Sequence, residues 1–235
     1  MKQILVISGK GGTGKTVVAA SLAVLANKSV IVDCDVDAAD LHLLLHPEIR
    51  QTQIFTGLPK AVIDQEKCTS CGECVEVCKY NAILKNDELQ FEIDTISCEG
   101  CAVCTHVCSV SAIFMTKHEA GQWFISETQF GPMVHAKLGI AEENSGMLVT
   151  TVRKEAQAIA QKNNLEYVII DGPPGIGCPV IASLTGVDIA LIVTEPTLSG
   201  IHDMTRVLKL ANSLGIKAVC VINKYDINTN NTEKI

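Results

Sequence analysis

The residues that most directly suggest chemistry lie near the N-terminus and have the spacing of a phosphate-binding loop. Residues 9–16 read GKGGTGKT and match G-x-x-x-x-G-K-[ST] between an apolar run and a helix-like segment. Glycines let backbone N–H groups turn inward around phosphate oxygens, and the following helix directs its positive end at the same anion. We expect Lys15 to neutralise the β- and γ-phosphates and Thr16 to ligate Mg²⁺. The flanking strand and helix argue against a glycine turn without function. The loop residues predicted to contact the nucleotide are Gly9, Lys10, Gly11, Gly12, Thr13, Gly14, Lys15 and Thr16.

Eight of the eleven cysteines make up two copies of one spacing, C-x-x-C-x-x-C-x-x-x-C. The sequence that begins at the last cysteine of each copy repeats as well, as CKYNAI and CSVSAI, so the segment is an internal duplication. The pattern resembles bacterial two-cluster ferredoxins, in which three thiolates of one run and the fourth of the other run hold each [4Fe–4S] cluster. The resemblance implies one cluster on Cys68, Cys71, Cys74 and Cys108. It implies a second cluster on Cys98, Cys101, Cys104 and Cys78.

Two alternatives to iron–sulfur clusters remain for these cysteines. Zinc sites usually combine two C-x-x-C units rather than two runs of four cysteines, and disulfides are rare in the cytoplasm. The sequence also departs from the ferredoxin pattern, because Lys79 and Ser109 follow the last cysteine of each run, where proline is usual. Proline shapes the backbone and removes an N–H donor near the cluster. Its absence leaves ligation intact and leaves the reduction potential open.

A second resemblance concerns the phosphate-binding loop. KGGTGKT resembles the deviant Walker A motif of the MinD/ParA/Mrp family, to which the nitrogenase iron protein is also similar. The resemblance implies that ATP is the nucleotide and that Lys10 reaches the partner's phosphates in a homodimer formed on ATP binding. It also matches Asp35, in VDCDVDAAD, to the aspartate that orients the attacking water. Lys10, Lys15 and Asp35 are therefore the predicted catalytic residues. A solvated loop lysine is the alternative for Lys10.

Two further segments match the same family. In YVIIDGPPG, Asp171 ends an apolar run and would hold Mg²⁺ through water, while Gly172 and Gly175 would let a backbone N–H approach the γ-phosphate. In VINKYD, Asn223 is the residue expected to read the base. Because N-K-x-D also occurs in GTPases, recognition of guanine through Asp226 remains an alternative.

Three cysteines lie outside the two runs. Cys34 and Cys178 lie beside the VDCDVDAAD and DGPPG segments, and Cys220 is expected to fill a buried strand as a small apolar residue. A structural role is the expectation for Cys178, because a lone cysteine in an apolar context is more often structural. By similarity to the nitrogenase iron protein, a cluster ligand shared between subunits is the alternative.

The elements that must position these residues alternate between strand and helix. Apolar runs predict strands at 3–8, 29–32, 167–170, 189–193 and 219–222, and helical spacing predicts helices at 16–27, 152–163 and 202–214. This alternation predicts an α/β fold with a doubly wound, mostly parallel sheet. The cysteine-rich segment has only short apolar fragments and interrupts that fold as an inserted α+β domain of the bacterial-ferredoxin type. The predicted domains are 1–60 and 118–235 for the two parts of the P-loop domain and 61–117 for the insert.

Composition excludes several classes of protein. The chain has 235 residues, of which 47% are hydrophobic, so a sizeable core is expected and disorder is not. A net charge of −7 and an aromatic content of 4% make a nucleic-acid partner a poor prediction. No stretch is long and apolar enough to span a bilayer, and the N-terminal apolar run is too short for a signal peptide. We therefore predict a cytoplasmic protein without a membrane segment in the sequence given.

Three functions fit these features. In the first, ATP hydrolysis gates electron transfer through the clusters to an unidentified redox partner, as in the nitrogenase iron protein. In the second, the chain is an assembly or carrier factor that gives clusters to an acceptor protein. The third is a MinD-like positioning ATPase with structural clusters, but no amphipathic membrane helix or basic patch supports it. The sequence stops at Ile235, just after a helix that Asn231 would cap, and family members continue further, so we expect a longer protein.

Overall fold

The chain forms two compact units. The computed structural model describes residues 1–139, 142 and 145–235. Unit 1 comprises Met1–Gln53, Gln122–Leu138 and Ser145–Ile235, and unit 2 comprises Ile54–Gly121 with residues 139 and 142 among those described. Each unit is described by itself.

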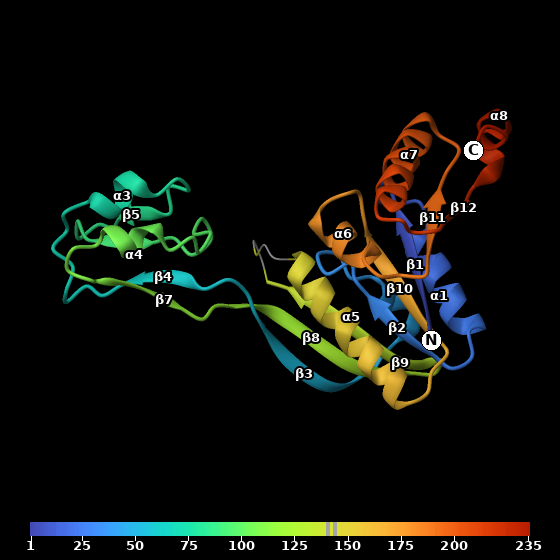
Figure 1. Ribbon diagram of the computed structural model, residues 1–235, viewed down its shortest axis with the longest axis horizontal. Helices are drawn as coiled ribbons and strands as arrows, with labels where there is room; N and C mark the ends of the chain where they lie inside the picture. Colours follow the sequence, from blue (N-terminus) through green and yellow to red (C-terminus); the bar gives the residue numbers. More distant parts are fainter. Residues whose placement is uncertain (140–141, 143–144) are drawn as a thin grey trace. The chain divides into compact units, whose positions relative to one another are not determined.

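Unit 1 is built on an eight-stranded sheet with the order β12-β11-β1-β10-β2-β9-β8-β3 (Figure 1). The strands are β1 (Lys2–Ser8), β2 (Ser29–Asp33), β3 (Glu48–Thr56), β8 (Glu119–Thr128), β9 (Gly131–Leu138), β10 (Tyr167–Pro174), β11 (Ile189–Thr194) and β12 (Ala218–Ile222). Every neighbouring pair from β12 to β9 runs parallel. The prediction of an α/β fold with a mostly parallel sheet is therefore confirmed.

Helices cover both faces of this sheet. Ala19 of α1 (Lys15–Leu25) packs with Val6 of β1, whereas Arg153 of α5 (Ser145–Lys162) donates to the Gln3 side chain of the same strand at 2.9 Å. Residues three apart on a strand point to opposite faces, so α1 and α5 lie on opposite sides. The remaining helices are α2 (Leu41–Leu45), α6 (Cys178–Leu184), α7 (Leu198–Ser213), the 3₁₀ turn η1 (Tyr225–Ile227) and α8 (Thr229–Thr232).

The central strands are apolar on both faces because helices cover both. Five residues of β2, SVIVD, are all buried, and β1 ends in four buried residues, LVIS. Both strands end in a buried polar residue, Ser8 and Asp33, at the edge where the loops of the site begin. The core thus fixes the positions from which those loops start.

Several predicted elements differ in extent. The helix expected at 152–163 begins at Ser145, because Leu148 and Val149 join its buried face. Strands β3, β8 and β9 were not predicted, since their polar and apolar residues do not form long apolar runs. The short last helix is capped by Asn228, whose side chain accepts from the Asn231 N–H, and not by Asn231 as expected. Cys220 is exposed and not buried, because β12 is the edge strand of the sheet.

Unit 2 repeats a small motif twice. In the first copy β4 (Lys60–Ile63) precedes α3 (Glu73–Val77) and β5 (Ile83–Lys85); in the second copy β6 (Phe91–Ile93) precedes α4 (Val103–Val107) and β7 (Ile113–Thr116). The first and last strands of the unit, β4 and β7, form one antiparallel pair. The two middle strands, β5 and β6, form a second antiparallel pair. Its core is small and includes cysteines, with Ala61, Ile63, Cys74, Ala82, Ile83, Phe91, Cys98 and Ile113 buried together.

Unit 2 is wider than the predicted insert at 61–117. The chain leaves unit 1 within β3 and returns within β8, so both boundaries fall inside strands. Two contacts join the extra residues to one another: the Gly57 N–H donates to the His118 carbonyl at 3.0 Å, and the His118 ring lies 2.6 Å from the Glu142 carboxylate.

Among the described residues, the helices are all too short or too polar to cross a membrane.

Candidate nucleotide site and candidate cluster sites

The phosphate-binding loop connects β1 to α1. Gly12 and Gly14 have φ values of 77° and 91°, in the left-handed region that favours glycine. A Cβ on Gly14 would also lie 2.3 Å from the Asn223 side-chain nitrogen, so this position excludes larger residues. The loop forms one wall of an open cavity of about 570 Å³. The lining residues are Ser8, Gly11, Gly12, Gly14, Lys15, Thr16, Val17, Asp35, Asp37, Ala38, Asp40, Pro173, Pro174 and Pro179.

Lys15 lies between two carboxylates at the cavity floor. Its Nζ is 2.7 Å from Asp171 Oδ1 and 3.6 Å from Asp35 Oδ2. Burial raises the pKa of Asp171, and the charge of Lys15 opposes that rise. Burial likewise raises the pKa of Asp35, again against Lys15. The structure thus brings together Lys15, Asp35 and Asp171, which come from three separate segments of the chain.

The oxygen donors at this point suit a magnesium ion. The second oxygen of Asp171, Oδ2, is buried and has no hydrogen-bond partner among the described residues. The Thr16 side chain lies near the Asp171 carboxyl and lowers its pKa. Mg²⁺ prefers hard oxygen ligands, commonly one or two carboxylates with water and substrate phosphates. The residues present therefore fit the ion.

Asp33 shapes the loop that carries Asp35, a role that the sequence did not reveal. Its two carboxylate oxygens accept from the Asp35 N–H at 3.0 Å and from the Leu41 N–H at 3.2 Å. Burial raises the pKa of Asp33 to about 8, helped by the nearby charge of Asp171. Because both N–H groups belong to the segment after β2, Asp33 fixes the path of that segment past the cavity.

The segment after Asp171 is held tightly against β1. A Cβ on Gly172 would lie 2.8 Å from a Leu5 methyl group and 3.1 Å from the Val6 carbonyl, so only glycine fits. Gly175 has a φ of 93°, and its N–H donates to the Ser8 carbonyl at 3.0 Å. The Gly175 N–H is therefore bonded to the end of β1, and the approach of a backbone N–H of this segment to a γ-phosphate stays a prediction.

Lys10 lies outside the cavity wall and forms an ion pair within its own chain. Its Nζ is 2.5 Å from Glu195 Oε1 and 3.0 Å from the Ser199 hydroxyl, at the start of α7. Glu195 also pairs with Lys224 at 3.2 Å, and these two lysines lower the pKa of its carboxyl. Neither Glu195 nor Lys224 was predicted from the sequence, because each is separated from Lys10 by more than 180 residues.

Asn223 reaches the outer side of the loop. Its side-chain amide donates to the Thr13 carbonyl at 2.9 Å, and the adjacent Lys224 donates to the Gly12 carbonyl at 3.2 Å. Asn223 is not among the residues that line the cavity.

Two other predicted loop residues, Thr13 and Gly9, are covered by the protein. The Thr13 side chain is buried, and its hydroxyl has no partner among the described residues. Gly9 is covered by α7, since a Cβ there would overlap the Asp203 backbone.

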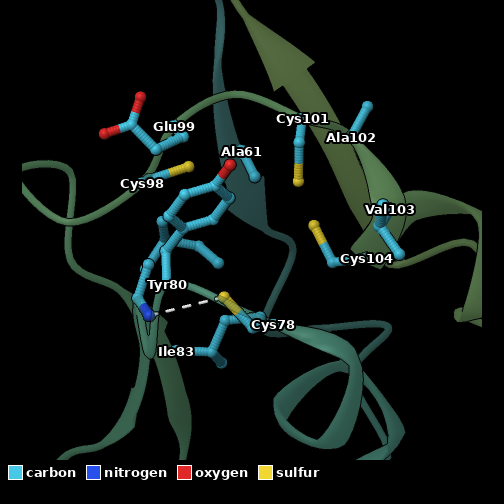
Figure 2. A pocket seen from close by; sticks show the side chains of 12 residues that line it. Ala61, Cys78, Tyr80, Ile83, Cys98, Glu99, Cys101, Ala102, Val103 and Cys104 are labelled. Atoms are coloured by element: carbon cyan, nitrogen blue, oxygen red, sulfur yellow. Dashed lines mark hydrogen bonds between the residues drawn. The ribbon is translucent and has the colours of Figure 1, made fainter. Parts of the chain in front are cut away.

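Two smaller cavities in unit 2 are lined by cysteines of both runs. Site A, a cavity of about 20 Å³, is lined by Cys68, Cys71, Cys74 and Cys108. Site B, also of about 20 Å³, is lined by Cys78, Cys98, Cys101 and Cys104. Figure 2 shows the four sulfurs of site B turned toward a shared space, with Tyr80 beside them. Each site therefore draws three cysteines from one run and one from the other.

The surroundings of both sites suit thiolate ligands. The Ala82 N–H donates to Cys78 Sγ at 3.4 Å, and the equivalent Ala112 N–H donates to Cys108 Sγ at 3.2 Å. The described residues include no group of three or more His, Cys, Asp or Glu arranged around a single metal ion. Four cysteines per cavity, apolar walls and N–H···S contacts fit an iron–sulfur cluster.

The remaining cysteines have different environments. Cys34 is fully buried, and burial raises the pKa of its thiol. Cys178 is exposed at the first residue of α6, next to Gly146 at the start of α5. The exposed Cys220 contacts the Met204 sulfur at 3.4 Å.

Comparison with known proteins identifies the class to which the chain belongs. Residues 4–235 match the CobQ/CobB/MinD/ParA nucleotide binding domain. The chain is therefore a member of this family of MinD/ParA-type nucleotide-binding ATPases, as the loop and the sheet indicated. The match spans both units.

Two relatives and one solved structure are similar to most of the chain. Two uncharacterised proteins of Methanocaldococcus jannaschii are 36% and 31% identical over 233 residues, which is 97% of this chain and 80% and 81% of those proteins. Among solved structures, the chain is similar to the septum site-determining protein MinD of Pyrococcus horikoshii in complex with Mg-ADP, with a TM-score of 0.52 and 19% sequence identity. The alignment covers 97% of this chain and 72% of the MinD chain. This last likeness concerns the fold alone.

Proposed function

We propose that this protein is an ATP-hydrolysing iron–sulfur protein that couples its nucleotide state to electron transfer through two [4Fe–4S] clusters. The observation that carries the proposal is the lining of sites A and B, each by four cysteines drawn from both runs. The proposed unit 2 is a ferredoxin-like module, and the proposed localisation is the cytoplasm. An assembly or carrier function is the alternative that the experiments below address.

The proposed ATPase reaction uses the cavity of unit 1. Backbone N–H groups of the loop and Lys15 would bind the β- and γ-phosphates, while Thr16 and Asp171 would hold Mg²⁺, with Asp171 acting through water. Asp35 would orient the attacking water, and it lies on the cavity wall, 3.6 Å from Lys15. The Mg²⁺ ion, when bound, neutralises charge that develops on the phosphates.

Lys10 is proposed to act in a homodimer that forms on ATP binding. The residue has to leave Glu195 to reach a partner's phosphates, because the two are paired within the chain. We propose Asn223 as the residue that reads the base, which requires its amide to release the Thr13 carbonyl. Both movements are local, since both side chains lie at the rim of the phosphate-binding loop.

The proposed cluster ligands are the eight cysteines of sites A and B. A [4Fe–4S] cluster supplies one-electron chemistry when bound, and its potential depends on charge, hydrogen bonds and solvent exposure. The N–H groups of Ala82 and Ala112 would stabilise the thiolates of Cys78 and Cys108. An acceptor protein for these electrons is proposed by class only, as a redox partner.

The first experiment is purification under argon with counts of iron and acid-labile sulfide. We expect on the order of eight of each per chain, as two [4Fe–4S] clusters require. Cys74→Ser should lower the iron count by about half. Cys220→Ser is the matched control, because this cysteine is exposed and lies in neither run, and it should keep full iron. Iron that is unchanged by Cys74→Ser would refute the ligand assignment.

The second experiment separates electron transfer from cluster delivery. The iron-loaded chain is mixed with an apo-ferredoxin and a chelator, and ATPase activity is measured with oxidised and with reduced protein. Retained iron and an ATPase rate that depends on the oxidation state support electron transfer. Rapid loss of iron to the apo-ferredoxin would favour the carrier function instead.

A further inference from the structure

We propose that Lys60 makes site B the more easily reduced of the two cluster sites, so that the first electron resides there. This inference rests on the proposed function, because it requires clusters at both sites. It concerns an asymmetry between the sites that the two identical cysteine spacings do not reveal.

The internal repeat supplies a comparison within one chain. Cys68 and Cys98 open the two runs and are 30 residues apart, and the same offset relates β4 to β6. It matches Lys60, at the start of β4, to Gln90, just before β6. The two halves therefore differ in charge at this position.

Lys60 contacts a proposed ligand of site B directly. Its Nζ donates to the Cys98 backbone carbonyl at 2.6 Å, and the side chain is half-buried. The positive charge is thus held at the backbone of one of the four cysteines. No bond from Gln90 to the equivalent Cys68 carbonyl occurs in the described part of the chain.

The segment that carries Lys60 is held tightly over the cysteine loop of site B. Gly100, between Cys98 and Cys101, has a φ of +66°, and a Cβ there would lie 2.3 Å from the Pro59 carbonyl. The equivalent residue in the first run is Ser70, whose Cβ would exclude such an approach. The close contact at Gly100 therefore positions Lys60 at site B only.

The carboxylates that line the cavities or precede the runs occur in matched pairs. One glutamate lines each cavity, Glu73 at site A and Glu99 at site B. Asp64 and Asp94 are equivalent in the repeat, and both accept backbone N–H groups at the loop that precedes each run. These two pairs therefore do not distinguish the sites.

Two lysines lie near site A, but solvent screens them more strongly. Lys67 pairs with Asp64 at 2.8 Å, and its side chain is 63% exposed. Lys85 is exposed and lies 5.1 Å from the centre of the Phe91 ring, which lines site A. Exposed charges act through water and counterions, whereas a half-buried charge bonded to the ligand backbone is screened less. A reduced cluster carries one more negative charge, so Lys60 favours reduction at site B.

The test is a redox titration of the iron-loaded chain, followed by electron paramagnetic resonance. We expect two reduction waves in the parent protein. Lys60→Gln, which copies Gln90, should shift the upper wave to lower potential. We expect about a tenfold change in the equilibrium constant for reduction, which corresponds to about 59 mV for one electron. Lys67→Gln removes an exposed charge from the same unit and should leave the upper wave in place.

The reciprocal variant keeps the test decisive if Lys60→Gln loses iron. The reciprocal variant combines Gln90→Lys with Ser70→Gly, which copies Gly100, and it should raise the lower wave and bring the two waves together. Iron-loaded Lys60→Gln with unchanged waves, a parent protein with a single wave, or an unmoved lower wave in the iron-loaded double variant would each overturn the inference. A parent chain that binds no iron would instead refute the proposed function, so the two failures are distinguishable.

Discussion

Replacing Lys15 by methionine tests whether the buried charges at the cavity floor depend on one another. The Lys15 side chain is 8% exposed, and its Nζ lies 2.7 Å from Asp171 Oδ1, whose own side chain is 1% exposed. Methionine keeps most of the side-chain volume and removes the charge. Asp171 then loses its ion pair and faces Asp35 without an intervening cation.

The magnitude follows from the burial of both partners. Removing one partner of a buried ion pair costs about 3–5 kcal/mol, because the other charge remains buried without compensation. Asp171 can relieve part of this cost by taking up a proton, so we expect about 3 kcal/mol. For a chain of this size that loss lowers the melting temperature by about 6–12 °C.

The assay is urea and thermal unfolding of nucleotide-free protein, followed by circular dichroism. Each transition is compared separately, because a chain with two compact units need not unfold in one step. Lys28→Met is the matched control, since Lys28 pairs with Glu166 at 3.2 Å with both side chains more than half exposed. Its expected cost is below about 1 kcal/mol. If Lys15→Met were as stable as Lys28→Met, the buried pair would not stabilise the fold and the reasoning would be wrong.

Three further predictions concern other parts of the chain. Burial lowers the pKa of His135 to about 4, so between about pH 6.5 and 4 the unfolded chain binds a proton that the folded chain does not, and the free energy of unfolding should fall as the pH drops through this range. In urea titrations, a His135→Phe variant should lack this part of the pH dependence. An equal dependence of stability on pH in both proteins would contradict the prediction. Glu195→Gln should cost about 1 kcal/mol because Lys10 loses its carboxylate, and an unchanged urea midpoint would count against the pair. Gly100→Ala should destabilise unit 2, because the added Cβ would collide with the Pro59 carbonyl. Amide hydrogen exchange in unit 2 should then be faster than in the parent protein, and equal protection would contradict the prediction.

Local sequence was sufficient wherever the chemistry depends on neighbours in the chain. The loop GKGGTGKT predicted its own strand, turn and helix, because glycine geometry and the apolar run are both local signals. The parallel strands of the core were equally clear, since burial on two faces requires continuous apolar residues. Strand β3 gave no such signal, because eight of its nine residues are exposed.

The sequence by itself therefore determined the class of sheet, the phosphate-binding loop and the identity of the eight clustered cysteines. Tertiary structure alone decided which residues meet: that Lys10 pairs with Glu195, that Asp33 holds the segment of Asp35, and that Lys60 contacts Cys98. The first and last of these contacts join residues 185 and 38 positions apart. Periodicity reports which face of an element is buried and carries no record of the element against which that face packs. Such partners are set by the topology of the fold, which brings distant loops to one edge of a sheet and joins the two repeats of unit 2.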